Sequence, residues 1–318
     1  MGGCRDPMTH RILVLLPVFN GAAFLAEQLE SILHQSHHPV GILCRDDGSS
    51  DNSAAILDQY QTRYPEQITI LPSGADRLGV IQSFAKLMQV ALSMADKDGG
   101  DVYFALADQD DTWQAEKLSA CLNALKKAEQ EQIDTPILVH SDLCVISEDG
   151  DKIAPSLMKY QGLRPERASF AAQLVSNTVT GCTTLFNVAL LRRALPMPSD
   201  TMMHDWWIAL VASAFGRRIY LPYALVQYRQ HSSNTLGARL YARGKLGSAL
   251  VKKVFQGNKD PFVQKQYEGL SRQAQAFYKR FGSELGPVDR MLLRRVVALA
   301  QSRRITQLCL FHGLRAWG

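Results

Sequence analysis

Four short apolar runs alternate with helical patterns over the N-terminal third of the chain, and this alternation restricts the fold more than any other feature. The runs are Arg11–Pro17, Val40–Arg45, Ile68–Leu71 and Val102–Ala107. Each has the length of a buried strand, and the segments between them carry apolar residues at helical spacing. Strands that alternate with helices in this way form right-handed βαβ units. We therefore predict an α/β fold with a mostly parallel central sheet and helices on both faces.

The pattern becomes less regular beyond the fourth run. Helical spacing recurs at Trp113–Gln130, Arg167–Val175 and His204–Phe215, and strand-like runs occur at Ile137–His140, Leu143–Ile146, Arg217–Leu221 and Leu225–His231. Beyond Leu236 the spacing is helical to the end, with Lys and Arg between the apolar residues. We therefore divide the chain into a disordered leader (1–10), a main α/β domain (11–235) and a basic helical C-terminal region (236–318).

Composition excludes several classes of protein. The 318 residues are 46% hydrophobic and 20% charged, as in an ordinary globular protein. No stretch approaches the roughly 18 apolar residues that span a bilayer. The six cysteines are scattered without C-x-x-C spacing, which argues against a zinc site or a disulfide framework. We expect a protein of the reducing cytoplasm.

Charge is distributed unevenly along the chain. Fifteen basic and four acidic residues lie from Tyr241 to Gly318, so this part carries a formal charge of +11, whereas residues 1–240 carry −6. Two interpretations of the basic region stay open: it rests on the anionic inner surface of the cell membrane, or it forms a helical cap with a solvated basic face. Nucleic-acid binding is not expected, because no recognisable module or aromatic interleaving accompanies the charge.

Three carboxylates follow the fourth apolar run directly. Asp108, Asp110 and Asp111 come after Val102–Ala107, at the end of a strand where ligands bind in open α/β sheets. One interpretation is a solvated acidic turn. The other is a site for Mg²⁺ or Mn²⁺, because these ions take carboxylate oxygens together with the phosphates of a substrate.

The second apolar run also ends in acids. Asp46 and Asp47 follow Val40–Arg45, so the predicted parallel sheet places them at the same edge as Asp108. Their carboxylates could accept hydrogen bonds from a nucleoside base or ribose, as acidic residues do in dinucleotide-binding folds. The alternative is a loop that only caps the next helix.

Two further clusters come later in the chain. Asp205, which begins a predicted helix beside Trp206, is either a capping acid or a general base next to an aromatic wall. His231, which ends a strand-like run, could be a metal ligand or a phosphate donor, and Arg229 could pair with a diphosphate. A lone histidine is more often structural.

Taken in order, these pieces resemble the family 2 glycosyltransferases, and within them bacterial enzymes of the rhamnosyltransferase type that build cell-surface polysaccharides such as O-antigen. The matching pieces span residues 11 to 235. They are Leu16-Pro17-Val18-Phe19-Asn20, Arg45-Asp46-Asp47-Gly48-Ser49-Ser50-Asp51, Leu78-Gly79-Val80-Ile81-Gln82-Ser83-Phe84, Ala107-Asp108-Gln109-Asp110-Asp111-Thr112-Trp113, Thr180-Gly181-Cys182-Thr183, His204-Asp205-Trp206-Trp207 and Tyr228-Arg229-Gln230-His231.

The resemblance implies a GT-A fold with a Rossmann-like sheet, and inverting transfer of a sugar from a nucleoside diphosphate. The donor-binding residues that it implies are Pro17, Val18, Asn20, Asp46, Asp47, Arg77, Asp108, Gln109 and Trp206. The implied ligands of Mn²⁺ or Mg²⁺ are Asp110 (the principal one), Asp108 and His231. Asp205 is the implied base that deprotonates the acceptor hydroxyl.

The resemblance also suggests substrates and partners. The expected donor is deoxythymidine-diphosphate (dTDP) rhamnose, and the expected acceptor is a saccharide or a lipid-linked saccharide at the inner membrane surface. The chain departs from the family pattern at Arg77 and Ser83, near positions where Asn is common, so Arg77 is expected to contact phosphate instead. A second hypothesis is a non-catalytic protein that binds nucleotide sugars, or a scaffold, on the same fold.

Overall fold

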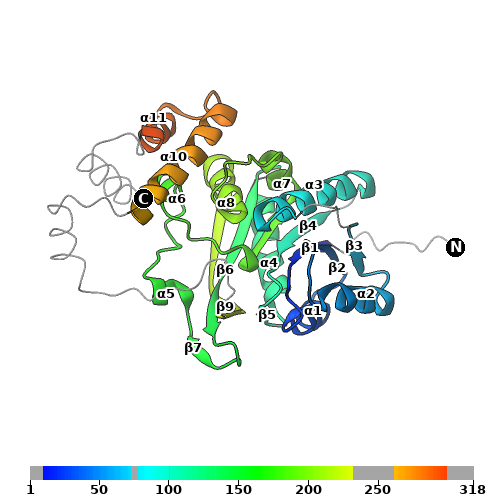
Figure 1. The fold of residues 1–318 in the computed structure, drawn as a ribbon. Helices are drawn as coiled ribbons and strands as arrows, with labels where there is room; N and C mark the ends of the chain where they lie inside the picture. The colour runs from blue at the N-terminus through cyan, green and yellow to red at the C-terminus, as the bar shows by residue number, and fades with distance from the viewer. Residues whose placement is uncertain (1–9, 73–76, 100, 133, 232–260, 299–318) are drawn as a thin grey trace.

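The computed structural model describes residues 10–72, 77–99, 101–132, 134–231 and 261–298. Its elements are β1 (Arg11–Val18), α1 (Leu25–Leu33), β2 (Val40–Asp46), α2 (Ser53–Arg63), β3 (Ile68–Ile70), α3 (Val80–Asp98), β4 (Val102–Leu106), β5 (Thr112–Trp113), α4 (Lys117–Glu131), β6 (Ile137–Ile146), β7 (Lys152–Ala154), α5 (Leu157–Gln161), α6 (Phe170–Val175), the 3₁₀ turn η1 (Gly181–Thr183), β8 (Thr184–Asn187), α7 (Val188–Ala194), α8 (His204–Phe215), β9 (Arg217–Arg229), α10 (Pro261–Phe281) and α11 (Pro287–Val297). Figure 1 shows the strands in one central sheet with the helices packed around it.

The sheet has the strand order β3-β2-β1-β4-β8-β6-β9-β5, with β7 paired to β6. Strands β1 to β4 pair in parallel, as their alternation with helices predicts. Strand β8 then runs antiparallel between β4 and β6, which makes the whole sheet mixed. The parallel half and the mixed half meet at β4, so the acids that follow β4 lie at the centre of the sheet's edge.

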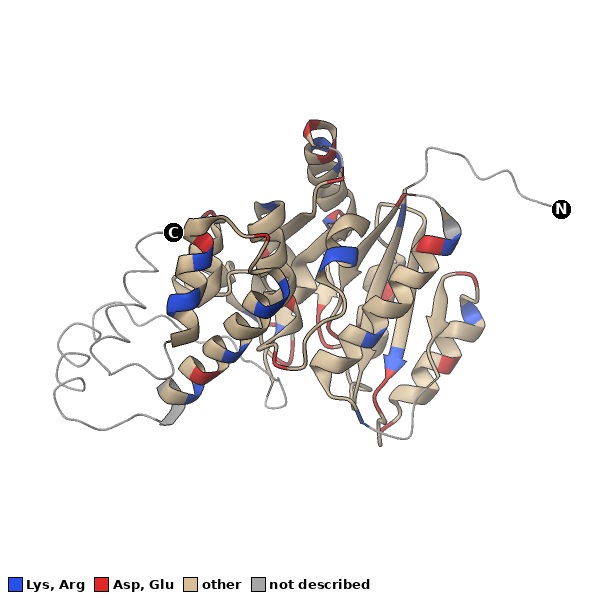
Figure 2. Ribbon diagram, turned by 90° about the horizontal axis from the view of Figure 1, so that it is seen from above, with Lys and Arg blue, Asp and Glu red and all other residues tan. Residues whose placement is uncertain are grey.

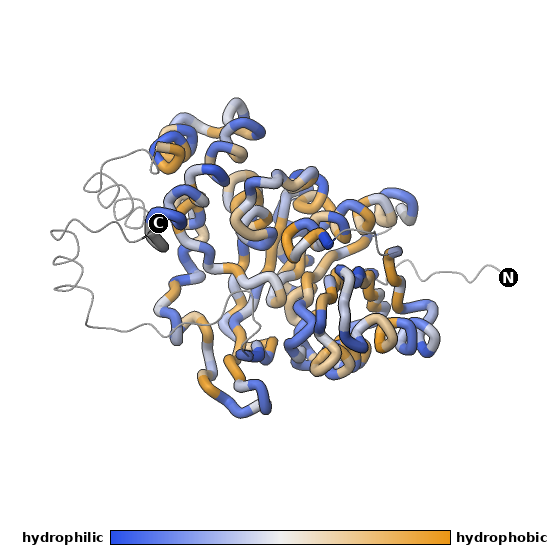
Figure 3. Tube along the Cα trace, in the orientation of Figure 1, coloured by the Kyte–Doolittle hydropathy of each residue, from blue (hydrophilic) through white to orange (hydrophobic). Residues whose placement is uncertain are grey.

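Each face of the sheet buries its own hydrophobic core. One core packs the sheet against α3, α6, α7 and α8, and it also contains side chains of α10 and α11. The other core packs the sheet against α1, α2, α4 and α5. Figures 1 and 3 show the hydrophobic central strands between these two layers of helices. Helices therefore cover both faces, as the sequence predicts.

The structure corrects three expectations about individual elements. Residues Ile137–Ile146 form one strand instead of two, because the polar side chain in its middle has partners: Asp142 accepts hydrogen bonds from Ser156 Oγ (2.5 Å) and Leu143 N (2.8 Å). The two strand-like runs between Arg217 and His231 are likewise one strand, β9, whose pairing with β6 shifts register. Trp113 belongs to strand β5, and the helix expected there begins at Lys117.

Parts of the expected leader and C-terminal region fall outside the described residues. Of the leader, only His10 is described, and its carbonyl accepts a hydrogen bond from the His37 ring (2.8 Å). Of the C-terminal region, residues 261–298 are described, and they include the two helices α10 and α11. None of the helices described here is both long enough and apolar enough to cross a bilayer.

Candidate active site

The ends of three neighbouring strands bring the predicted donor loops together. Strand β1 lies between β2 and β4, and Val18 pairs with Asp46 while Leu15 pairs with Leu106. Because all three strands are parallel, the chain leaves each of them at the same edge of the sheet. The loops that begin at Asp47 and Asp108 therefore flank the end of β1, as the sequence predicts.

The side chain of Gln109 holds the loop after β1. Its Oε1 accepts a hydrogen bond from Phe19 N (2.8 Å), and its Nε2 donates one to Phe19 O (3.0 Å). Gly21 packs so closely on this amide that an added Cβ would lie 2.4 Å from Gln109 Cδ. The amide of Gln109, expected to bind the donor, is thus engaged with the protein main chain and fixes the loop after β1.

Asn20 and Asp46 belong to a network between the first two loops. Asn20 has a positive φ of 49°, a conformation that Asn tolerates. Its Oδ1 accepts from Ser50 N (2.7 Å), while Ser49 Oγ accepts from Asn20 N (2.9 Å) and donates to Asp46 (2.5 Å). This network fixes the loop in which the resemblance places the nucleotide. The side chain of Val18, expected to line that pocket, is fully buried in the core.

Asp47 is buried and saturated with hydrogen bonds. Its carboxylate forms an ion pair with Arg45 and accepts from Leu78 N (2.8 Å) and Gly79 N (2.7 Å) at the start of α3. Burial alone would raise the pKa of this carboxyl, but the hydrogen bonds from Arg45, Leu78 and Gly79 outweigh burial and lower the pKa. Asp47 therefore joins β2 to α3, and this structural role competes with the expected contact to base or ribose.

Arg77 lies beside the end of β1, against Phe19. It is exposed, and its guanidinium stacks on the ring of Phe19 with Cζ 3.5 Å from the ring centroid. The stacking holds the cation beside the end of β1, and Pro17 is partly exposed within the same strand end. This position is compatible with the phosphate contact expected of Arg77.

Strand β5 brings the acidic cluster next to the end of β9. Thr112 pairs with Gln227 and Trp113 with Val226, so the chain before β5 runs past the residues that follow Gln227. The consequence is a hydrogen bond of 2.8 Å between His231 Nε2 and Asp110 Oδ2. Asp110 and His231, both expected as metal ligands, are thus neighbours, and the two-residue strand that joins them was not recognised in the sequence.

Asp108 and Asp111 complete the acidic cluster. Asp108 Oδ, Asp111 Oδ and Cys182 Sγ lie within 4.8 Å of one another. Burial raises the pKa of Asp108 to about 7, and the nearby charges of Asp110 and Asp205 add to this effect. Asp111 is 1% exposed, and its Oδ2 has no hydrogen-bond partner among the described residues.

These residues fit a hard divalent cation. The carboxyl groups of Asp108 and Asp111 have a raised pKa, and Asp111 Oδ2 has no hydrogen-bond partner among the described residues. The positive charge of a bound cation would lower both pKa values and would satisfy that oxygen. Asp108 is partly exposed and Asp111 is buried, and both belong to the group whose ligand atoms lie within 4.8 Å of one another. Asp110, expected as the principal ligand, is partly exposed but is not part of that group, and its carboxylate bonds His231. The thiol of Cys182 is too soft a ligand for Mg²⁺ or Mn²⁺, and burial raises its pKa, which keeps it protonated.

Arg229 does not match the expectation that it pairs with a diphosphate. It is 4% exposed. Its guanidinium contacts the carbonyl oxygens of Asp110 (3.1 Å) and Glu148 (2.8 Å) and the carboxylate of Glu27 (2.7 Å). These contacts use the side chain to fix the backbone of the acidic loop, so Arg229 supports the site from behind.

Asp205 lies in the first turn of α8 and is buried, with 8% of its surface exposed. Asn177 Nδ2 donates a hydrogen bond to one carboxylate oxygen (3.1 Å), and Gly181 N donates to the other (3.0 Å). Burial raises the pKa to about 6, and these hydrogen bonds limit the rise. Asp205 is therefore ionised near neutral pH and more basic than an exposed aspartate.

The residues around Asp205 are held in place. Trp206 Nε1 donates to the carbonyl oxygen of Gln173 (2.6 Å), so its indole N–H is used within the protein. His204 stacks on Phe84 with ring centroids 3.8 Å apart, and burial lowers its pKa to about 3. A Cβ on Gly181 would lie 3.0 Å from His204 Nε2, so a side chain here would require the imidazole ring to shift by a few tenths of an ångström.

Sequence reasoning missed three residues that organise the site. Asn177 binds Asp205, and Gln28 Nε2 donates to the carbonyl oxygen of Asp108 (2.8 Å). Lys117 is fully buried, its Nζ has no hydrogen-bond partner among the described residues, and it lies 3.3 Å from the centroid of the Trp113 ring. Gln28 and Lys117 each place a polar residue on the apolar face of a predicted helix, and this signal could have indicated both. Asn177 gives no such signal.

Comparison with known sequences identifies the family. The sequence model described as Glycosyl transferase family 2 matches residues 13–195, which is more than half of the chain. The chain belongs to this family. It is a transferase, and one relative is the dTDP-rhamnosyl transferase RfbG of Shigella flexneri, which is 25% identical over 238 residues covering 72% of this chain and 76% of the relative. Both findings confirm the resemblance stated from the sequence.

Solved structures show the fold of this transferase. TarS of S. aureus (residues 1–349, in complex with UDP-GlcNAc) matches with a TM-score of 0.55 and 14% identity, covering 96% of this chain and 90% of that chain. GalNAc-T7 with UDP, GalNAc and Mn²⁺ matches with a TM-score of 0.53 and 13% identity, covering 72% of this chain and 45% of that chain. The fold is GT-A, as the sequence predicts.

Proposed function

We propose that this family 2 enzyme is an inverting, metal-dependent glycosyltransferase that moves rhamnose from dTDP-rhamnose to a saccharide or lipid-linked acceptor in the biosynthesis of a cell-surface polysaccharide. The observation that carries the proposal is the buried Asp205 carboxylate, whose charge helps to raise the pKa of Asp108 across the site. A base and an acidic metal-binding cluster within electrostatic reach are the two parts that such a transfer needs.

The chain's own residues suffice for the proton transfer. Asp205 takes the proton of an acceptor hydroxyl, and that oxygen attacks the anomeric carbon as the bond from this carbon to the diphosphate breaks. Because attack comes from the side opposite the leaving group, one displacement inverts the anomeric configuration. Asn177 and Gly181 hold both carboxylate oxygens so that the base keeps one orientation.

Asp108 and Asp110, with His231 beside Asp110, would hold the divalent cation. When bound, the cation neutralises the developing charge of the diphosphate leaving group. Gln28 and Arg229 fix the carbonyl oxygens of Asp108 and Asp110, so the backbone that presents these carboxylates is rigid. The choice of rhamnose is supported by the similarity to the Shigella relative, a dTDP-rhamnosyl transferase.

The decisive experiment combines turnover with the configuration of the product. Purified full-length protein is given Mn²⁺, a panel of nucleotide sugars and saccharide acceptors, and nucleoside diphosphate release is measured. We expect dTDP-rhamnose to be the best donor and NMR to show an anomeric configuration opposite to that of the donor. Asp205→Asn should lower kcat roughly a thousandfold, within the range that general-base catalysis supplies, while Mn²⁺-dependent donor binding persists.

Three outcomes would refute parts of the proposal. A product with retained configuration would exclude the single displacement. Unchanged turnover in Asp205→Asn would exclude this residue as the base. If the protein bound donors but turned none of them over with any acceptor, the alternative of a non-catalytic nucleotide-sugar-binding protein would be preferred.

A further inference from the structure

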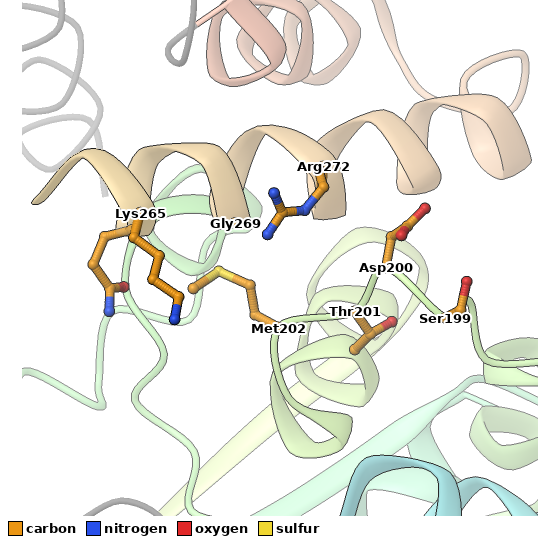
Figure 4. Close-up of a pocket in the computed structure, with 8 residues that line it drawn as sticks. Ser199, Asp200, Thr201, Met202, Lys265, Gly269 and Arg272 are labelled. Atoms are coloured by element: carbon orange, nitrogen blue, oxygen red, sulfur yellow. The ribbon is translucent and has the colours of Figure 1, made fainter. Parts of the chain in front are cut away.

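A pocket of about 500 Å³ lies outside the donor site, between α10 and the segment that leads into α8. Figure 4 shows this segment below α10, with the side chains of Lys265 and Arg272 extending from the helix toward it. The pocket is lined by Ser199, Asp200, Thr201, Met202, Lys265, Gln266, Gly269 and Arg272. No residue that the resemblance assigns to donor or metal is among them.

The pocket is close to the proposed base. Met202 lines it, and Met203 is the N-cap of α8, whose first turn carries Asp205. Consecutive Cα atoms are about 3.8 Å apart, so the Cα atoms of Met202 and Asp205 are separated by no more than roughly 11 Å. Met202 N donates a hydrogen bond to Gln273 Oε1 (2.9 Å), which fixes the segment against α10. The segment that lines the pocket is therefore within about 11 Å of the proposed base, measured between Cα atoms.

The charges in the pocket favour an anion. Lys265 and Arg272 are exposed, and neither forms a hydrogen bond or ion pair with the residues that the structure describes. Asp200 is the one acid among the lining residues, so the pocket has a net positive charge. Arg and Lys together provide a bidentate fork and a mobile point charge, the combination that suits a phosphate group.

Unpartnered polar atoms give a second, independent indication of a ligand. Thr201 lines the pocket and is 6% exposed, yet its Oγ1 has no hydrogen-bond partner among the described residues. Gln273, which is 1% exposed and binds Met202 N, has an unpartnered Nε2 within the same described part. Buried polar groups are nearly always paired in native proteins, so the unpaired hydroxyl of the lining residue Thr201 marks a polar contact that the described residues do not supply. Gln273 is not among the lining residues.

Gly269 keeps the pocket open. A Cβ at this position would lie 3.2 Å from Met202 Cε and 3.3 Å from Met202 Sδ. These contacts are tight, so a side chain here would push Met202 away from α10 or fill the space between them. The absence of a side chain on the pocket-facing turn of α10 thus preserves room for a ligand.

We propose that this pocket binds a phosphate group of the acceptor, so that the enzyme acts on a phosphate-bearing saccharide whose attacking hydroxyl reaches Asp205. The proposal rests on the transferase function proposed above and adds the chemical class of its acceptor. Arg272 and Lys265 hold the phosphate oxygens, and Thr201 Oγ1 is a further donor. Asp200 would repel a phosphate at close range but can accept hydrogen bonds from saccharide hydroxyls beside it.

The first test measures binding with glucose 1-phosphate as the probe, in the metal-free protein so that the donor site does not bind phosphate through a cation. We expect glucose 1-phosphate to bind and glucose not to bind. Lys265→Gln and Arg272→Gln should each weaken the affinity about tenfold, and Asp200→Asn should strengthen it. Lys279→Gln, which removes an exposed cation of α10 that does not line the pocket, should leave the affinity unchanged.

Equal affinity in all variants, equal binding of glucose, or no detectable binding of glucose 1-phosphate would overturn the pocket assignment. A lipid surface is the competing occupant. If Lys265→Gln and Arg272→Gln abolish flotation with phosphatidylglycerol vesicles but leave glucose 1-phosphate affinity unchanged, these cations bind lipid headgroups and the proposal is wrong.

A second measurement separates this proposal from the transferase function. Thermal stabilisation by Mn²⁺ and nucleotide sugar should be the same in wild type, Lys265→Gln and Arg272→Gln, because the donor site is elsewhere. If wild type shows no donor stabilisation while the variants still weaken glucose 1-phosphate binding, the transferase proposal fails and the anion site stands. If donor stabilisation is normal but glucose 1-phosphate affinity does not depend on these cations, only the acceptor proposal fails.

Discussion

Two opposing effects set the pKa of the Asp205 carboxyl group. Burial in α8's first turn raises its pKa to about 6, while hydrogen bonds from Gly181, Trp206 and Asn177 favour the ionised form. A base with a pKa near the working pH is ionised and still accepts a proton readily. If Asp205 is the base, as we propose, its surroundings set the acidic limit of the reaction.

A pH profile tests this assignment. Below a pH of about 6 the folded protein holds Asp205 protonated, so kcat/KM for the acceptor should fall about tenfold per pH unit. Asn177→Ala removes a donor that stabilises the carboxylate, so the acidic limb should move to higher pH. An acidic limb that stays in place in this variant would mean that another group controls the profile.

Lys117 is a second residue whose buried position disfavours its charged form. It is fully buried without a hydrogen-bond partner in the described part of the chain, and burial lowers its pKa to about 8, although Cys121, Cys182 and Asp111 oppose this shift. The unfolded chain holds the proton up to the ordinary pKa of 10.5. Between about pH 8 and 10.5 the unfolded state therefore binds more protons, and stability due to this residue rises with pH.

Lys117→Met should relieve this cost. The free energy of unfolding should increase by roughly 1–4 kcal/mol at pH 7, the range found when buried charges are replaced by apolar residues. The advantage over wild type should shrink as pH rises from 8 to 10.5. Denaturant titrations of the metal-free protein measure this, with Lys127→Met, an exposed lysine on the same helix, as the control. A destabilised variant would show that Lys117 neutralises the acidic cluster.

At the scale of elements, α10 packs on α8, the helix that carries Asp205. Phe277 is fully buried, and its ring centroid lies 5.4 Å from that of Trp207 in α8, 5.3 Å from that of Phe170 in α6 and 4.9 Å from that of Phe281. Arg280 donates hydrogen bonds to carbonyl oxygens at the end of α7, including that of Arg193 (2.8 Å). These contacts favour the interpretation of a packed helical cap for α10 and α11.

Phe277→Ala should destabilise the protein by roughly 3–5 kcal/mol, as expected when a large aromatic side chain is removed from a packed core. Chemical denaturation followed by circular dichroism measures the loss. Gln275→Ala, an exposed position on the same helix, should have no comparable effect. A loss below about 1 kcal/mol would show that α10 docks only loosely on α8.

Local pattern predicted some elements well and others poorly. The boundaries of α8 follow from the helical spacing of its apolar residues. Those of the first parallel strands follow from their short apolar runs, and the runs of β2 and β4 end in acids. Strand β5 could not be found this way, because its two residues are defined only by pairing with β9. The same pairing joins Asp110 to His231, so the contact between these two expected metal ligands depends on a partner far along the chain. Asn177 gave no local signal because it acts through a residue 28 positions later.

At the scale of the whole molecule, exposed cations lie on the C-terminal helices. Figure 2 shows Lys and Arg along α10 and α11, at the end of the molecule opposite β1, β2 and β3. Some of these cations are used internally, as Arg280 is, while Lys265, Arg272 and Lys279 are exposed. Exposed cations near an anionic bilayer contribute about 1 kcal/mol each. Membrane contact thus remains our proposal alongside the packed cap.

Vesicle flotation tests the membrane proposal on the full-length chain. We expect the protein to float with vesicles that contain phosphatidylglycerol at low ionic strength, and to be released as salt rises, because screening shortens the reach of the attraction. Phosphatidylcholine vesicles serve as the control and should not bind it. Failure to float with anionic vesicles at any ionic strength would leave only the helical cap.

The close contact between Gly21 and Gln109 has a consequence for engineering. The two positions form a unit, because any side chain at 21 would displace the amide that holds the main chain of Phe19. Combinatorial libraries aimed at a new donor should therefore keep both residues fixed and diversify the exposed Arg77 instead. Variants recovered with a change at position 21 should carry a compensating change at position 109.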